Sequence, residues 1–323
     1  MIRHYDFAPL DGITKIVFRR VHHRLFGGAD RYFIPFFSPV SEHILTKRDR
    51  RELDPAQNGG LPLVPQVMTR RAPDFLWAAE LLRDMGYPEA NLNLGCPSGT
   101  VTAKGKGSGF LAKPDELDRF FDEVFARTAL PVSVKTRLGV QSPEEFGRLL
   151  EIYNRYPIKS LVIHPRVQKE FYKGGVHQDV FALALAESAN PVCYNGDLVT
   201  EADCGAFAAR FPAVETVMIG RGAVADPALL RKLRGGAPAS GGEVEAFSRT
   251  LYQEYQAFYG QPAQAVQRMK EVWFYLIRLF EGDEQERYAR RMRRLRTPGE
   301  YEELESAIFR DLALRTEASG PMV

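Results

Sequence analysis

The stretch Asn91–Gly109, NLNLGCPSGTVTAKGKGSG, contains the most informative pattern in the chain. It begins as an apolar run, leaves that run through Gly95, Cys96 and Pro97, and continues as a segment of Gly, Ser, Thr and Lys. A thiol where a buried strand ends, followed by a long flexible cationic loop, indicates a functional site. A buried cysteine packed as a small hydrophobe, with ordinary turn glycines, would explain the same residues. The rest of the chain decides between these two interpretations.

Short β-rich segments alternate with segments of helical periodicity up to about residue 235. Eight strands and eight helices predict a closed parallel (β/α)8 TIM barrel, a fold of the α/β class. The competing fold, an open doubly wound sheet, would carry a GxGxxG turn after an early strand, and none is present. The predicted strands are Tyr5–Leu10, Tyr32–Phe37, Leu63–Met68, Ala90–Leu94, Val132–Thr136, Leu161–His164, Val192–Asn195 and Thr216–Ile219. The predicted helices are Thr14–Leu25, Ser41–Leu53, Ala72–Met85, Pro114–Arg127, Pro143–Tyr156, Gln178–Glu187, Glu201–Arg210 and Pro227–Leu233.

A second, smaller domain follows the barrel. The segment GGAPASGG at 235–242 has little to pack and is typical of a linker. Beyond it we find only helical patterns, which predict a small C-terminal helical bundle. The predicted division is a catalytic barrel at 1–235, a linker at 236–242 and a helical domain at 243–323. The predicted helices of this domain are Glu243–Tyr259, Ala263–Phe280, Glu284–Arg296 and Tyr301–Arg315.

The composition, 45% hydrophobic and 26% charged residues, is that of a soluble globular protein. No apolar run reaches the roughly 20 residues of a membrane span, and the N-terminus lacks the apolar region of a signal peptide. We therefore expect a cytoplasmic protein without a membrane partner. The three cysteines lack metal-ligand spacing, so we expect reduced thiols and no metal site.

The distribution of charge is more informative than the net charge of +2. Arginines crowd residues 287–296, with few acidic residues among them. Such a block suits a polyanionic partner, although a solvated helix face is the more common meaning of a charge run. The candidate contacts to the polyanion are Arg290, Arg293 and Arg294.

Polar residues follow nearly every predicted strand, and hydrogen-bond donors outnumber acidic groups among them. Because TIM barrels place their chemistry at the C-terminal ends of the strands, this ring predicts an anionic cofactor or substrate. The last two strands are followed by Asn195–Asp197 and Gly220–Gly222, with Arg221 between two glycines. Glycines let the backbone approach a ligand, and barrels commonly bind phosphate at this place. We predict a phosphate group here rather than a plain turn.

Six short motifs mark the strand ends: APLDG at 8–12, NLGCPS at 93–98, VKTRLG at 134–139, HPR at 164–166, NGD at 195–197 and MIGRG at 218–222. In this order and spacing they resemble the tRNA-dihydrouridine synthases over the whole barrel. The resemblance extends more weakly to RMKEVW at 268–273. It implies FMN-dependent reduction of the C5=C6 bond of uridine in folded tRNA, with NADPH as the reductant.

The resemblance also implies roles for individual residues. Cys96 matches the catalytic cysteine, which would protonate C5 after a flavin hydride reaches C6. An unperturbed thiol is mostly protonated at neutral pH, as such an acid must be. Lys135 would stabilise the anionic reduced flavin, and Asn93 would bond near the base and the flavin. Arg137 and Arg166 fit the site as substrate-binding residues. The other cofactor positions are Pro9, Leu10, Gln66, His164, Asn195, Asp197, Gly220 and Arg221.

Other functions fit parts of this pattern. A flavin barrel acting on a free pyrimidine or another small enone would share the barrel and the phosphate site, but would not need the helical domain. A Schiff-base aldolase would use Lys135 and leave Cys96 without a role. A catalytically idle RNA-binding protein would not need either side chain. We expect a monomer, because the polar features are assigned to the cofactor and the RNA.

Overall fold

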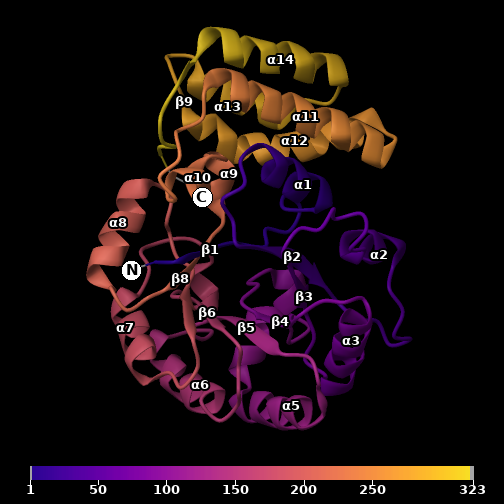
Figure 1. Cartoon of the computed structure of the whole chain (residues 1–323), viewed down its shortest axis with the longest axis vertical. Helices are drawn as coiled ribbons and strands as arrows, with labels where there is room; N and C mark the ends of the chain where they lie inside the picture. Colours follow the sequence, from indigo (N-terminus) through magenta and orange to yellow (C-terminus); the bar gives the residue numbers. More distant parts are fainter. Residues whose placement is uncertain (1, 321–323) are drawn as a thin grey trace.

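The computed structural model of the chain describes residues 2–320, and its centre is a closed barrel of eight parallel strands. The barrel closes because β1 pairs with both β2 and β8. Helices surround the strands (Figure 1), so the predicted (β/α)8 barrel is confirmed. The strands are β1 (His4–Phe7), β2 (Arg31–Phe37), β3 (Leu63–Val67), β4 (Ala90–Leu94), β5 (Val132–Arg137), β6 (Leu161–His164), β7 (Val192–Tyr194) and β8 (Thr216–Ile219).

The outer helices begin at recognisable sequence signals. In α5, Pro114 occupies the first turn and two acidic residues follow it, which is favourable at a helix N-terminus. The barrel helices are α1 (Ile16–Leu25), α2 (Lys47–Leu53), α3 (Ala72–Asp84), α4 (Gly99–Thr102), α5 (Pro114–Arg127), α6 (Phe146–Tyr153), α7 (Gln178–Glu187), α8 (Glu201–Arg210), α9 (Arg221–Ala225) and α10 (Leu229–Lys232). Short 3-10 turns are η1 (Gly107–Ala112), η2 (Pro143–Glu145) and η3 (Gln168–Glu170).

Several of the predicted helices are wrong in extent, including Pro143–Tyr156, which is η2 followed by the shorter α6. The helix predicted at Ser41–Leu53 begins only at Lys47, because the Thr46 hydroxyl accepts a hydrogen bond from the Asp49 N–H and caps it there. His43, before this cap, has a φ of 52° and is not helical. The helix predicted at Pro227–Leu233 is the shorter α10, and Arg221 itself begins α9.

The C-terminal region is a bundle of helices that packs on one side of the barrel, beside α1, α9 and α10 (Figure 1). Its helix α11 begins at Gly241, inside the predicted linker, because Ser240 caps it. The expectation of helices alone was wrong for two short segments, β9 (Phe280–Glu281) and β10 (Ala313–Leu314), which pair antiparallel. The helices are α11 (Gly241–Tyr259), α12 (Pro262–Leu276), α13 (Gln285–Arg294) and α14 (Pro298–Asp311), with the 3-10 turn η4 (Ile277–Leu279) after α12.

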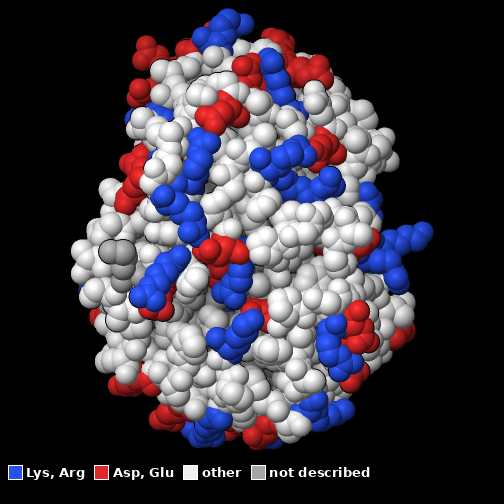
Figure 2. Space-filling view, viewed as in Figure 1, with Lys and Arg blue, Asp and Glu red and all other residues white. Residues whose placement is uncertain are grey.

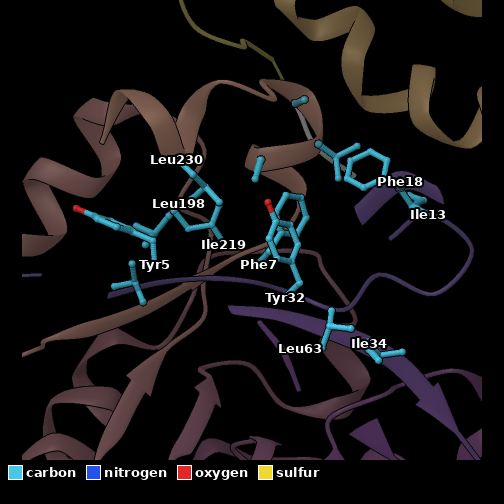
Figure 3. Packing of buried hydrophobic residues seen from close by; sticks show 14 of the residues in the cluster. Tyr5, Phe7, Ile13, Phe18, Tyr32, Ile34, Leu63, Leu198, Ile219 and Leu230 are labelled. Carbon is cyan, nitrogen blue, oxygen red and sulfur yellow. The ribbon is translucent and has the colours of Figure 1, made fainter. Parts of the chain in front are cut away.

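The apolar core continues from the barrel strands into this bundle. Phe7 and Tyr32 stack with ring centroids 5.5 Å apart, and Phe18 lies edge-on to Phe7 at 5.8 Å (Figure 3). Phe247 of α11 contacts Phe18 at 5.8 Å. His22 lies in the same cluster and bonds the Tyr32 hydroxyl at 2.9 Å, and burial lowers its pKa to about 3. The bundle is therefore held to the barrel by aromatic packing around an uncharged histidine.

The strands run clockwise from β1 to β8 in Figure 1. Because crossovers between parallel strands are right-handed, this view shows the end of the barrel at which the strands begin. Figure 2 shows the same face, where basic and acidic side chains are interspersed. Below the surface, Arg31 at the start of β2 forms an ion pair with the buried Asp6 of β1 at 2.6 Å. Within residues 2–320, every helix is too short or too polar to cross a lipid bilayer.

Candidate active site

A cavity of about 490 Å³ opens at the C-terminal ends of the barrel strands. Its lining comes from the C-terminal parts of the strands, from the segments that follow them and from one residue of α12, Tyr275. The predicted site residues that line it are Pro9, Leu10, Gln66, Asn93, Cys96, Lys135, Arg137, His164, Asn195, Asp197, Gly220 and Arg221. The barrel thus brings together twelve side chains or backbone segments that are spread over more than 200 positions of the sequence.

Cys96 lies directly after β4 and is held by its own backbone. The N–H groups of Gly95 and Cys96 both donate to Asn93 Oδ1 at 3.0 Å, and Ser108 donates its N–H and its hydroxyl to the Cys96 carbonyl. Gly107 has a φ of 56°, and a Cβ there would lie 2.8 Å from that carbonyl oxygen. The segment expected as a flexible loop is therefore packed against Cys96, partly as α4 and η1. Burial raises the pKa of the Cys96 thiol, which keeps it protonated at neutral pH.

Lys135 and Arg137 project from β5 with different surroundings. Lys135 lines the cavity, and burial, helped by the nearby charge of Arg137, lowers its pKa to about 8. Arg137 is 1% exposed and donates to three backbone carbonyls, those of Gly95, Val167 and Phe171, at 2.7 to 3.1 Å. The guanidinium of Arg137 therefore ties the Cys96 segment to the segment that follows β6.

His164, Arg166, Asp197 and Arg221 form a connected group beside β5, in the segments that end β6 and follow β6, β7 and β8. Asp197 accepts from Arg166 at 2.5 and 2.9 Å and from Arg221 at 2.7 Å. Burial opposes ionisation of Asp197, but the Arg166 hydrogen bonds lower its pKa. Burial and the charge of Arg137 lower the pKa of His164, which is neutral. Because Arg166 only donates, His164 Nε2 accepts from it at 3.1 Å and the ring proton lies on Nδ1.

The other predicted site residues lie away from the cavity lining. Arg166 is 1% exposed and is directed at Asp197 and two backbone carbonyls of its own loop. The candidate contacts to a polyanion are all exposed on α13: Arg290, Arg293 and Arg294.

Sequence reasoning missed Phe36 of β2 and three aromatic residues outside the strands, all of which line the cavity. Phe171 and Tyr172 lie in the loop after β6 and are 48% and 39% exposed. The Tyr172 ring lies beneath two guanidinium groups, at 5.2 Å from Arg137 and 5.0 Å from Arg221. The available signal was a pair of adjacent aromatics in a Lys- and Gly-rich loop. The third residue, Tyr275, lies outside the row of buried apolar residues of α12. An aromatic residue at such a position was the available signal that it contacts something other than the bundle core.

The chain matches the profile of a known protein family. The profile of the dihydrouridine synthase family matches residues 6–312. The chain belongs to the dihydrouridine synthase family. The match begins in β1 and ends after α14, so it includes both the barrel and the helical bundle. It confirms the predicted family and, with it, the prediction of an enzyme.

Relatives within the dihydrouridine synthase family cover most of the chain. A protein of Rhodobacter capsulatus named "Probable tRNA-dihydrouridine synthase" is 32% identical over 267 residues, which are 79% of this chain and 80% of the relative. One of Staphylococcus epidermidis with the same name is 31% identical over 71% of each chain.

Solved structures resemble this family member in fold only. Morphinone reductase superposes with a TM-score of 0.52 at 12% identity, over 74% of this chain and 88% of the reductase. The structure titled "TcOYE with pHBA" gives a TM-score of 0.51 at 10% identity, over 72% and 88% of the two chains.

Proposed function

We propose that the chain reduces the C5=C6 bond of uridines in tRNA to give dihydrouridine, with FMN as the cofactor and NADPH as the reductant. Membership of the dihydrouridine synthase family and the names of its relatives support the substrate. The single observation that carries the chemistry is that Cys96, Asn93 and Lys135 line one cavity. Asn93 and Lys135 are partners in register on β4 and β5, and Cys96 follows three residues after Asn93.

The residues of the cavity fit FMN. The volume of about 490 Å³ falls within the range of cofactor sites, about 300–1,000 Å³. Lys135 and Arg221 supply two cations, one inside the barrel and one beside the backbone of Gly220 and Gly222, as an anionic ring system and a phosphate require. Asp197 holds Arg221 by a hydrogen bond of 2.7 Å, so the cation is oriented before a ligand arrives.

FMN held in the cavity would take a hydride from NADPH and would supply it to C6 of the uracil. The chain itself must stabilise negative charge on the cofactor and deliver a proton to C5. Lys135 serves the first purpose, since an anion bound beside it raises its pKa again and makes it a full cation. Cys96 serves the second, because burial keeps its thiol protonated and the two hydrogen bonds to Asn93 Oδ1 fix its backbone.

We assign the RNA to the face that joins the cavity mouth to the helical domain. The proposed division is a catalytic barrel at 1–235, a linker at 236–242 and an RNA-recognition domain at 243–323, acting as a monomer. Tyr275 of α12 already reaches the cavity, so a bound nucleotide contacts both domains. Exposed arginines of α13 neutralise backbone phosphates farther out: Arg290, Arg293 and Arg294.

Replacement of Cys96 by alanine tests the proposal. Cys96→Ala should retain FMN, because the thiol is not a cofactor ligand, and should lose dihydrouridine formation on the order of 100-fold or more. The assay is mass spectrometry of tRNA after incubation with NADPH. Cys204→Ala, which alters a thiol in α8 that is 3% exposed, is the matched control and should keep full activity.

Two results would refute the proposal. Normal turnover by Cys96→Ala would remove the assigned acid. Purified protein without bound flavin, or reduction of free uridine as fast as tRNA, would remove the cofactor or the RNA substrate.

A further inference from the structure

A chain of buried polar side chains begins at the end of the barrel where the strands start. Its first member, Glu89, is 1% exposed and is paired with Arg31 and Lys159. Ser133 donates its hydroxyl hydrogen to Glu89 Oε1 at 3.0 Å. Asn91 Nδ2 donates in turn to Ser133 Oγ at 2.9 Å, across the register pair of β4 and β5. These contacts extend the series of hydrogen-bonded side chains from an ion pair at the start of the strands to the middle of the barrel.

The same chain continues to the cavity. Gln66 Nε2 donates to Asn91 Oδ1 at 2.8 Å, and Asn93 Nδ2 donates to Gln66 Oε1 at 2.7 Å. Asn93 Oδ1 then accepts from the N–H groups of Gly95 and Cys96. We call these five side chains, none more than 7% exposed, the interior relay: Glu89, Ser133, Asn91, Gln66 and Asn93.

The two ends of the interior relay fix the direction of every hydrogen bond in it. The Glu89 carboxylate is paired with Arg31 and Lys159 and accepts, so Ser133 donates to it and accepts from Asn91. A backbone N–H only donates, so Asn93 presents Oδ1 to the Cys96 segment and Nδ2 to its neighbour. Turning any amide between these ends would set donor against donor or acceptor against acceptor. The side-chain amides are therefore held in one orientation.

Packing alone does not require the interior relay. The rest of the barrel interior, including another position of β3, is filled by an apolar cluster of Ala8, Phe33, Val64, Val162, Cys193 and Met218. A buried polar network gains little net stability, because desolvation offsets its hydrogen bonds, but it does fix orientation. Only Gln66 and Asn93 of the relay line the cavity. The other three members act on the cavity only through these two.

We propose that Glu89, Ser133 and Asn91 are positioning residues for the reaction. They hold the amides of Gln66 and Asn93 in the orientation that the cavity needs, and through Asn93 they fix the backbone of Cys96. The catalytic meaning of this inference rests on the proposed function, because it takes Cys96 as the proton donor. The geometric part, that Glu89, Ser133 and Asn91 control the placement of Cys96, does not depend on the proposed function.

Alkylation of Cys96 by iodoacetamide in the flavin-free protein tests the geometric part. The other two thiols, Cys193 and Cys204, are 0% and 3% exposed, and peptide mass spectrometry separates all three. Ser133→Ala and Asn91→Leu interrupt the interior relay at two successive members. Each should raise the alkylation rate of Cys96 on the order of fivefold to tenfold across the pH profile, because one hydrogen bond that orders its segment is lost.

Two further variants separate positioning from general destabilisation. Val64→Ala removes buried volume from the same interior without touching a hydrogen bond, and should keep the alkylation rate within about twofold of the wild-type rate. Ser133→Thr retains the hydroxyl, so its Cys96 should be alkylated at the wild-type rate. Far-UV circular dichroism first confirms folding, and Asn91→Leu decides the matter if Ser133→Ala does not fold.

The half-reactions of the flavin-loaded protein test the catalytic part. The relay variants should slow oxidation of the reduced enzyme by tRNA on the order of tenfold, and should slow flavin reduction by NADPH less than that. Unchanged alkylation in both relay variants, or equal acceleration in Val64→Ala, overturns the inference. Faster alkylation in relay variants of a protein whose wild type forms no dihydrouridine supports the positioning and refutes the proposed function.

Discussion

Replacing Lys135 by methionine removes a cation from the inside of the barrel while keeping a side chain of similar length. Burial lowers the pKa of Lys135 from 10.5 to about 8, a difference of about 2.5. A pKa difference of one corresponds to about 1.4 kcal/mol, so the charged lysine costs the flavin-free fold at most about 3.5 kcal/mol. We therefore expect Lys135→Met to stabilise the flavin-free protein at pH 7 and, at the same time, to weaken its binding of FMN.

The stability advantage of Lys135→Met over the wild type should depend on pH in a definite direction. Because the folded pKa is the lower one, the unfolded chain binds more protons between about pH 8 and 10.5, and stability of the wild type rises through that window. Below pH 8 the full cost of the charge is present. The advantage of Lys135→Met should therefore be constant below pH 8 and decline toward pH 10.5.

Thermal unfolding of flavin-free protein at pH 7 and pH 10 measures both quantities. Lys135→Arg, which keeps the charge at both pH values, is the control and should not stabilise the fold. A methionine variant that is no more stable than the wild type at pH 7 would refute the reasoning. An advantage that does not change between the two pH values would refute it as well, because it would come from packing rather than from charge.

Three other changes have definite expected outcomes. Replacing the exposed arginines of α13 by glutamine should lower the slope of log affinity for tRNA against log salt by about 2 to 3, measured by filter binding; they are Arg290, Arg293 and Arg294. The matched controls already have acidic partners and should change the slope less; they are Arg287 and Arg291. Arg137→Met should destabilise the protein by about 2–4 kcal/mol in urea unfolding, opposite to Lys135→Met, because three carbonyls lose their donor. Gly12→Ala should cost about 1–3 kcal/mol in the same assay, since φ is +89° and its Cβ would lie 3.0 Å from Glu271 Oε2; Gly147→Ala, on an open helix face, should not destabilise.

The barrel could be predicted because its signals are local. Strands such as Ala90–Leu94 and Leu161–His164 have the predicted bounds, and α5, α7 and α8 begin and end at the predicted residues. Since parallel strands end on the same side of a barrel, the strand ends then identified most of the cavity lining. Boundaries failed where a side chain decides them, as at Thr46, whose hydroxyl ends the irregular segment before α2.

The less predictable part of the site depends on contacts between distant segments. Tyr275 reaches the cavity only because α12 packs against the barrel, which periodicity does not reveal. No role was predicted for Asn91 and Ser133, which are fully buried polar residues that bond each other across adjacent strands. Arg137 was assigned to substrate, and its three bonds to backbone carbonyls were not visible in the sequence.

The wall that α12 contributes has a consequence for synthesis of the protein. Arg268 donates to the carbonyl of Gly12 at 3.2 Å, and Tyr275 lines the cavity, so residues made late complete a pocket begun at the N-terminus. On the ribosome the eight strands emerge well before this helix, and domains fold in the order in which they appear. The barrel of the growing chain therefore lacks part of its cavity lining until translation has passed α12.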